Sequence, residues 1–389
     1  MDTLHDPVAG LALTYLEKWT AAPDTQLTSD PGIPVLAHLV AATGDPGATA
    51  TAARAVAVWA RTAGRGPGHP ALYDGGLAGT LVGLRLGARL HPALHRAADR
   101  LRDHLTGDTI AAAWRTADVA FPDYDLISGP AGILLALCAG AEPTEPQLRR
   151  SVHHLVSLCD RDDLPRLRTG QYERHPYLSW TNRRVNTGMG HGVAGVVTAL
   201  TAALRRTGDP KTAQALRRAT GWLAARSYVD ERGIRTWPGA GLDGAAPPAD
   251  AHPRQAWCYG TPGVAWALWD AADALDDREA AGWALTAFRT LAERYDEDFH
   301  LFGDGPADVL GLCHGAAGVL AVADAFGRHA QLPAAVLGAR LAAHLEGRLP
   351  DALDTPWQAG LLTGAPGALS ALLTARGGGR DWLPCLGLR

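Results

Sequence analysis

Several features are scarce in this sequence, and each scarcity excludes a class of protein. No run approaches the ~20 consecutive apolar residues that a membrane-spanning helix needs, and the first seven residues lack the basic and apolar regions of a signal peptide. Charge of one sign is also missing, because 36 Lys and Arg residues face 40 Asp and Glu residues. This balance argues against a dedicated nucleic-acid surface or an anchor for anionic membranes. We therefore expect a cytoplasmic protein that recognises its partner locally.

Cysteine is scarce as well, with five residues in a chain of 389. An odd and small number cannot form a disulfide framework for a chain of this length, and it indicates free, catalytic or metal-bound thiols instead. Alternating β-branched segments are short everywhere, so the sequence offers few strand signals. Apolar residues make up 47% of the chain, enough to bury a large helical core.

The most informative feature that is present is a repeat of Gly-x-x-Gly followed at once by an apolar, helix-forming run. Its six clear copies are Gly76–Gly79, Gly129–Gly132, Gly192–Gly195, Gly260–Gly263, Gly315–Gly318 and Gly364–Gly367. A degraded seventh copy begins near Asp30-Pro31-Gly32. Such self-similarity indicates one supersecondary unit that is too small to bury its apolar face alone.

That unit is predicted to be a pair of helices. Residues 198–204, 266–275 and 317–325 are apolar nearly all round, as inner helices would be, whereas 93–105 and 214–225 carry Arg on one face. We expect an all-α fold: a single α/α toroid over residues 1–389, with about seven inner and outer helix pairs and the glycine motifs at the inner-helix starts. An open solenoid is the structural alternative. Two long stretches, 160–187 and 230–255, interrupt the helices and are expected to be functional loops.

Candidate chemistry recurs just before the first glycine of three consecutive repeats. These positions hold Gly190-His191, Cys258-Tyr259 and Cys313-His314. Equivalent positions converge if the repeats close into a ring, and two thiolates with one imidazole are ligands that Zn²⁺ prefers. Three protein ligands leave a fourth position open, which is typical of catalytic zinc. Positions before helix N-termini are also expected to lower the pKa of both thiols.

Four further residues are candidates for the same site. His191 is interpreted as a fourth ligand or a general acid/base, and we favour acid/base. Asp125, four residues before its repeat glycine, either orients an imidazole or caps a helix. Arg254 lies four residues before Cys258 and would stabilise an enolate or bind peptide carbonyls, unless it is a solvated loop residue; Tyr259 is a weaker candidate. The remaining cysteines are given no chemistry: Cys138 and Cys159 are interpreted as packing residues, and Cys385 as packing against the ring.

Three segments within this glycine repeat together closely resemble the lanthionine cyclase (LanC) family. They are Trp257-Cys258-Tyr259-Gly260-Thr261-Pro262-Gly263, Gly311-Leu312-Cys313-His314-Gly315 and Gly190-His191-Gly192-Val193-Ala194-Gly195. The resemblance spans essentially the whole chain. It implies an α/α toroid with one zinc on Cys258, Cys313 and His314, acid/base residues at Asp125 and His191, and an active-site arginine at Arg254. The departures are a first repeat without paired glycines and Gly190 where alanine is often found.

The resemblance further implies the addition of peptide cysteine thiols to dehydroalanine or dehydrobutyrine, which forms the thioether rings of lanthipeptides. The partners would be a dehydrated precursor peptide and a separate dehydratase. A protein prenyltransferase is a rival enzyme, but its zinc site resembles Asp, Cys and His. A second rival is a LanC-like protein that serves as a peptide-binding scaffold or adds glutathione to dehydrated peptides. An α/α-barrel glycosidase is disfavoured because no carboxylate pair stands on the repeat frame.

Overall fold

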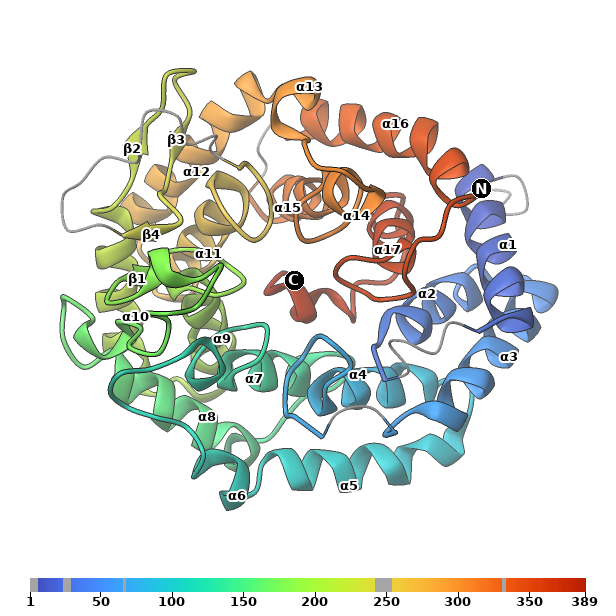
Figure 1. The fold of residues 1–389 in the computed structure, drawn as a ribbon, viewed down its shortest axis with the longest axis horizontal. Coiled ribbons are helices and arrows are strands. Elements are labelled where there is room, and N and C mark those ends of the chain that lie inside the picture. The colour runs from blue at the N-terminus through green and yellow to red at the C-terminus, as the bar shows by residue number, and fades with distance from the viewer. Residues whose placement is uncertain (1–5, 24–28, 66–67, 242–253, 331–333) are drawn as a thin grey trace.

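The helices of the computed structural model form two concentric rings, seen along their common axis in Figure 1. The structure describes residues 6–23, 29–65, 68–241, 254–330 and 334–389. Within these residues the inner ring has seven helices: α2 (Gly32–Ala41), α4 (Leu77–Gly87), α7 (Pro130–Cys138), α9 (Val193–Thr207), α11 (Thr261–Ala274), α15 (Ala316–His329) and α17 (Ala365–Ala375). The outer ring has seven partners: α1 (Pro7–Ala21), α3 (Pro46–Thr62), α5 (His95–Leu105), α8 (Glu145–Leu158), α10 (Pro210–Ala224), α12 (Arg278–Arg294) and α16 (Ala335–Ala352).

The two rings differ in sequence because they differ in surroundings. The inner helix α11 is buried along nearly its whole length, whereas the outer helix α10 buries one face and exposes Arg217 on another. Outer helices begin with strong sequence signals. The Asp45 and Asp209 side chains accept hydrogen bonds from the amides of Ala48 at 2.6 Å and Thr212 at 2.8 Å, and each is followed by proline at the first helical position.

Short elements fill the connections between these helices. The short helices are η2 (Pro92–Leu94), α6 (Asp108–Ala111), η3 (Phe121–Asp123), η4 (Pro165–Leu167), η5 (Ser179–Thr181), α13 (Glu297–His300), α14 (Pro306–Val309) and η6 (Leu383–Leu386). The strands are β1 (Val185–Asn186), β2 (Tyr228–Val229), β3 (Arg235–Thr236) and β4 (Ala240–Gly241). Strand β1 pairs antiparallel with β4, so the two long loops meet; part of the second loop, 242–253, lies outside the described residues.

A circle of backbone hydrogen bonds joins the turns that precede the inner helices. In each bond a backbone amide donates to a carbonyl of the neighbouring repeat. Written with the donor first, the bonds are Leu72 to Ile127 (3.0 Å), Leu126 to Gly190 (3.1 Å), Met189 to Cys258 (2.8 Å), Cys258 to Cys313 (3.3 Å) and Cys313 to Leu362 (3.0 Å). Equivalent positions of successive repeats are therefore neighbours around one axis.

Side chains complete this circle through the first repeat: Asp30 links the last repeat to the first, and the hydroxyl of Thr80 on α4 donates to the carbonyl of Ser29 at 3.3 Å. Asp30 accepts hydrogen bonds from the amides of Leu361 at 2.6 Å and Gly32 at 2.9 Å. Its side chain is buried, and burial raises the pKa of Asp30 to about 7. The closure confirms the toroid, and the open solenoid is wrong. That the ring is one folding unit stays a prediction.

The C-terminal segment occupies the centre of the ring (Figure 1). Three buried aromatic side chains donate hydrogen bonds to consecutive carbonyls of this segment: Tyr73 to Cys385 (2.6 Å), Trp257 to Leu386 (2.8 Å) and Trp266 to Gly387 (2.9 Å). The tail thus passes directly behind Trp257, the neighbour of Cys258, and continues along α11.

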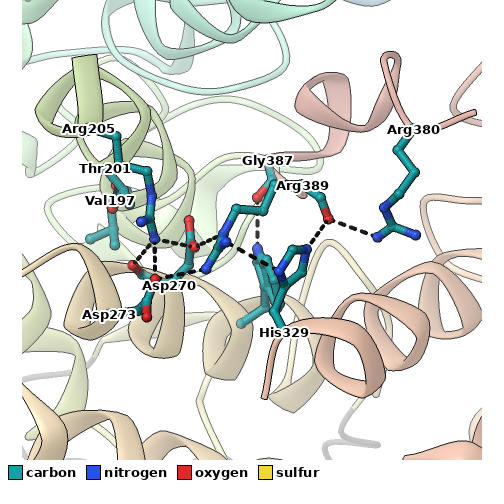
Figure 2. Close-up of polar contacts among 10 residues, drawn as sticks. Val197, Thr201, Arg205, Asp270, Asp273, His329, Arg380, Gly387 and Arg389 are labelled. Atoms are coloured by element: carbon teal, nitrogen blue, oxygen red, sulfur yellow. Dashed lines mark hydrogen bonds and ion pairs between the residues drawn. The ribbon is translucent and has the colours of Figure 1, made fainter. Parts of the chain in front are cut away.

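The last residue ties three inner helices together, as Figure 2 shows. The guanidinium of Arg389 donates to Asp270 at 2.7 Å and Asp273 at 2.8 Å near the end of α11, and both carboxylates also bind Arg205 of α9. The backbone oxygen of Arg389 lies 3.0 Å from the ring nitrogen Nε2 of His329 on α15. Because Asp270 and Asp273 lie near the end of α11 opposite to Cys258, the tail fills the ring away from the cysteines.

The second glycine of a Gly-x-x-Gly motif, such as Gly318, is predicted to be required for close packing of its inner helix. A Cβ at Gly318 would lie 1.9 Å from the carbonyl oxygen of Leu312, whereas a Cβ at Gly327, in the same helix, would meet nothing within 4 Å. We expect Gly318→Ala to lower the free energy of unfolding by about 1–3 kcal/mol, the usual cost of overpacking. Gly327→Ala is the matched control, and it should be neutral or stabilising by up to about 1 kcal/mol. Urea unfolding followed by circular dichroism measures both, and equal stability of the two variants would contradict this account.

Candidate metal centre

The structure brings Cys258, Cys313 and His314 together. Cys258 lies two residues before the cap glycine of α11, and Cys313-His314 lie directly before that of α15. Their ligand atoms all lie within 4.8 Å of one another. The reason is the circle of backbone bonds, in which the amide of Cys258 donates to the carbonyl of Cys313. This cluster can hold a metal ion.

Two adjacent ligands can face one point because the turn around them is very tight. A Cβ at Gly315 would lie 2.5 Å from the amide nitrogen of Leu310 and 2.6 Å from that of Gly311. The turn therefore needs glycine for close approach, since the φ of Gly315 is an ordinary −102°. Gly260 is different, because its φ of +85° places the backbone after Cys258 in a region that other residues rarely adopt.

Electrostatics around the sulfurs differ from the expectation that helix N-termini lower their pKa. The pKa of Cys313 is raised well above its ordinary value, because its thiol is hydrogen-bonded to Cys258 and buried. That expectation is therefore wrong for Cys313 when only protein groups surround it. The neighbouring sulfur and burial raise the pKa of this thiol more than the helix N-terminus lowers it. A cation between the sulfurs would stabilise the thiolates and lower the pKa of both thiols. The donor set therefore fits a soft or borderline metal ion.

Asp308, which the sequence did not point to, lies beside His314. Its Oδ1 is 3.5 Å from Nδ1 of His314, and α14 carries it there one turn before the ligands. A carboxylate beside one ring nitrogen leaves Nε2 available for a metal and fixes the orientation of the ring. The pKa of His314 is raised, first by its hydrogen bond to Cys313. The signal in the sequence was one aspartate in a short Pro-Ala-Asp-Val segment, too common to interpret.

His191 and Asp125 form a directly bonded pair. Nδ1 of His191 lies 2.6 Å from Oδ2 of the fully buried Asp125. The other carboxylate oxygen of Asp125 accepts from the amides of Ser128 at 2.7 Å and Gly129 at 2.9 Å. Asp125 therefore orients the imidazole and satisfies amides of the turn before α7. It does not cap this helix, whose N-cap is Gly129 without a side-chain hydrogen bond, so that interpretation is wrong. His191 is not among the residues whose ligand atoms meet in the cluster.

Phe121 contacts the ring of His191, and Tyr124 contacts its backbone. Phe121 stacks on the imidazole with centroids 4.5 Å apart, and the hydroxyl of Tyr124 donates to the carbonyl of His191 at 3.0 Å. The sequence did not single out either residue, because a Phe-Pro-Asp-Tyr-Asp segment carries no spacing that identifies an aromatic contact. Stacking on Phe121 reduces the number of orientations that the imidazole can adopt, and the bond from Tyr124 fixes the backbone that carries it.

Tyr259 and Arg254 lie at the same turn as Cys258. The hydroxyl of Tyr259 accepts a hydrogen bond from the side-chain amide of Asn186 at 2.8 Å, and burial raises the pKa of Tyr259. The guanidinium of Arg254 lies 4.0 Å from the centroid of the Phe302 ring. Within the described residues, its buried Nη1 has no hydrogen-bond partner. Its charge acts on His314, where it lowers the pKa of the imidazole.

The other three cysteines are packing residues. Burial raises the pKa of Cys138 to about 11 and that of Cys159 to about 12, so neither is a nucleophile at neutral pH. Cys385 is buried in the tail, where its carbonyl accepts from Tyr73. These positions agree with the interpretation from the sequence.

The double ring of helices and the Cys-Cys-His cluster at its inner-helix starts define an α/α toroid with a candidate metal site. The chain belongs to the lanthionine synthetase C-like family, whose model matches residues 2–384. A solved structure named nisin cyclase is similar over 97% of this chain and 96% of its own, with a TM-score of 0.75 and 19% identity. This likeness confirms the fold.

Two further comparisons add nothing to the fold or the site. An unsaturated glucuronyl hydrolase from Bacillus sp. GL1 covers 77% of this chain and 87% of its own at 18% identity, with a TM-score of only 0.38. A search of curated proteins gave no significant match. Among the described residues, no helix has the length and apolar character needed to cross a membrane.

The ligand cluster predicts one equivalent of zinc per chain. We expect Cys313→Ala to lose most of the metal while keeping its helical circular dichroism, because the helices pack independently of one sulfur. Cys138→Ala, a cysteine outside the cluster, is the matched control and should keep a full equivalent. Elemental analysis of the purified proteins measures both. Full retention of zinc by Cys313→Ala would refute the proposed site.

Proposed function

We propose that this protein is a zinc-dependent lanthipeptide cyclase, built as a single toroidal domain. It would add cysteine thiols of a dehydrated peptide to dehydroalanine or dehydrobutyrine, giving lanthionine and methyllanthionine rings. The observation that carries the proposal is the Cys258, Cys313 and His314 cluster in a toroid of this family. The hydrogen-bonded His191 and Asp125 support it.

Cys258, Cys313 and His314 would hold the zinc, with Asp308 orienting His314 through Nδ1. Zinc bound there supplies the Lewis acidity that makes a peptide thiol a thiolate at neutral pH, where free cysteine is mostly protonated. Three protein ligands leave a position for the substrate, the arrangement of catalytic rather than structural zinc.

His191 is the proposed acid/base. Nδ1 faces Asp125, so Nε2 is the nitrogen that would exchange a proton with the peptide. Nε2 would take up the proton that the peptide thiol loses. Attack of the thiolate sulfur on the β-carbon of the dehydro residue would form an enolate, and return of this proton from Nε2 would complete the addition at the α-carbon. Asp125 holds the imidazole in one tautomer and stabilises its charged form.

Arg254 and Tyr259 are proposed to bind the polar groups of the peptide. Among the residues that the structure describes, buried Nη1 of Arg254 has no partner, and an enolate or carbonyl oxygen would satisfy it. Tyr259 stays a neutral hydroxyl because burial raises its pKa, so it can donate a hydrogen bond while Asn186 holds it in place.

The proposed partners follow from the chemistry. The substrate is a precursor peptide whose serines and threonines a separate dehydratase has already dehydrated. All five cysteines are free, which agrees with action in the reducing cytoplasm. The alternative function is a LanC-like scaffold that binds dehydrated peptides, or an enzyme that adds glutathione to them; the same metal cluster would serve it.

The reaction itself predicts a product with the mass of its substrate, since adding a thiol across an alkene gains and loses no atoms. A dehydrated precursor with free cysteines should keep its intact mass while its alkylatable thiols disappear and fragmentation is suppressed between the joined residues. Mass spectrometry before and after alkylation measures this. A mass increase with glutathione would favour the alternative, and thiols that all stay alkylatable would exclude the cyclase.

Replacing His191 separates proton transfer from metal binding. His191→Asn should keep its zinc and lower turnover by ~10²–10⁴-fold, the usual contribution of a positioned acid/base group. His153→Asn changes an exposed histidine on α8 and is the matched control, with unchanged turnover. Elemental analysis and the alkylation assay measure the two properties. Loss of zinc would make His191 a ligand, and unchanged turnover would give it neither role.

A further inference from the structure

Exposed large apolar side chains are rare on this protein, and two of them lie on the loop before β1. Among the described residues they are Tyr177 (81% exposed), Trp180 (45%), Val229 (54%) and Val336 (68%). Tyr177 and Trp180 are three residues apart, beside the start of η5, in the long loop between α8 and α9. Scattered single apolar residues need no explanation, but two aromatic rings on one loop near a site suggest a binding surface.

A row of rings connects Tyr177 with the proposed acid/base. His191 stacks on Phe121 at 4.5 Å between centroids, and Phe121 contacts Tyr172 at 4.8 Å. Tyr172 contacts His175 at 5.8 Å, and His175 contacts Tyr177 at 6.4 Å. The row begins at His191, whose side chain is 35% exposed, passes through the buried rings of Phe121 and Tyr172, and ends in solvent at Tyr177. Contacting rings therefore connect the site with Tyr177.

Trp180 lies close to Tyr259 of the same site. The Cβ position of Gly239 is 3.2 Å from Cη2 of Trp180 and 3.7 Å from Cε1 of Tyr259. The exposed indole is therefore separated from the tyrosine next to Cys258 by a single small residue. A Cβ at position 239 would crowd the indole, while it would make an ordinary contact with the ring of Tyr259.

Hydrogen bonds fix the loop that carries these rings. Nδ1 of His175 accepts from the amides of Tyr177 at 3.2 Å and Leu178 at 3.1 Å. The hydroxyl of Thr169 donates to the carbonyl of Thr181 at 2.6 Å, and β1 pairs with β4 directly afterwards. The rings are held in place with their faces open, which lowers the entropy that binding would cost.

We propose that Tyr177 and Trp180 form an aromatic platform that binds apolar side chains of the substrate peptide next to its reacting residues. This inference rests on the proposed function, because it takes the dehydrated peptide as the occupant. The continuity of the rings with His191 and Tyr259 favours a chain that extends from the site. A second copy of this protein is disfavoured, since a stable interface buries about 800 Å² on each partner, far more than two rings offer.

Two synthetic peptides that cannot react test the platform. Each is a short linear peptide with S-methylcysteine for cysteine and alanine for the dehydro residue; one carries Leu and Phe flanks, the other Ser and Gly flanks. Isothermal titration calorimetry should show that the apolar peptide binds the zinc-loaded protein more tightly. The double variant Tyr177→Ala and Trp180→Ala should weaken this binding about tenfold, as loss of aromatic anchors does, and remove the preference. Val336→Ala on α16, also exposed, is the matched control with unchanged affinity.

Because the peptides cannot react, their binding separates the platform from the reaction. A preference that the double variant loses supports the platform even if dehydrated precursors keep all their thiols. Equal affinity of wild type and double variant for the apolar peptide would overturn the platform. The platform would also be overturned if peptide binding is unchanged and the wild type sediments as a dimer while the double variant sediments as a monomer. The rings would then form a contact between two copies of this chain. With a reactive peptide, the double variant should have a KM raised by about tenfold and a kcat that changes much less.

Discussion

The backbone hydrogen bonds that circle the ring axis decide where every candidate functional residue lies. From the turn before α4 to the turn before α17, each turn is joined to the next by a backbone hydrogen bond. The side chains of Asp30 and Thr80 complete the circle through the first repeat. Residues far apart in sequence therefore become neighbours whenever they hold equivalent repeat positions. Cys258 and Cys313 are joined directly in this way, so the metal cluster is a consequence of the same bonds that close the fold.

The tail and the long loops give this circle two different sides. The tail contacts Trp257 behind the cysteines and runs along α11 to Asp270 and Asp273. On the other side, the loop between α8 and α9 brings Tyr172 and Trp180 beside Phe121 and Tyr259. A peptide would therefore reach the ligands from the side of the loops, because the opposite side is filled by the tail.

The repeat made much of this predictable from the sequence. Gly-x-x-Gly spacing predicted the inner helices, the closed ring and the meeting of Cys258, Cys313 and His314. In a closed ring, residues at equivalent positions of neighbouring repeats lie close together. Asp308 and Phe121 were not predictable, since they stand outside that frame and act through contacts that only the folded connections create. The pKa of Cys313 was predicted in the wrong direction, because neither its burial nor the distance between the two thiols can be derived from the sequence.

The cluster of Cys258, Cys313 and His314 is proposed to bind zinc with a position left for a peptide thiol. X-ray absorption at the zinc edge counts the sulfur atoms bound to the metal directly. We expect two sulfur ligands in the protein alone, from Cys258 and Cys313, and three after a peptide with a free cysteine is added. Fewer than two sulfurs in the protein alone would contradict the site, and an unchanged count with saturating peptide would contradict activation of the peptide thiol by the metal.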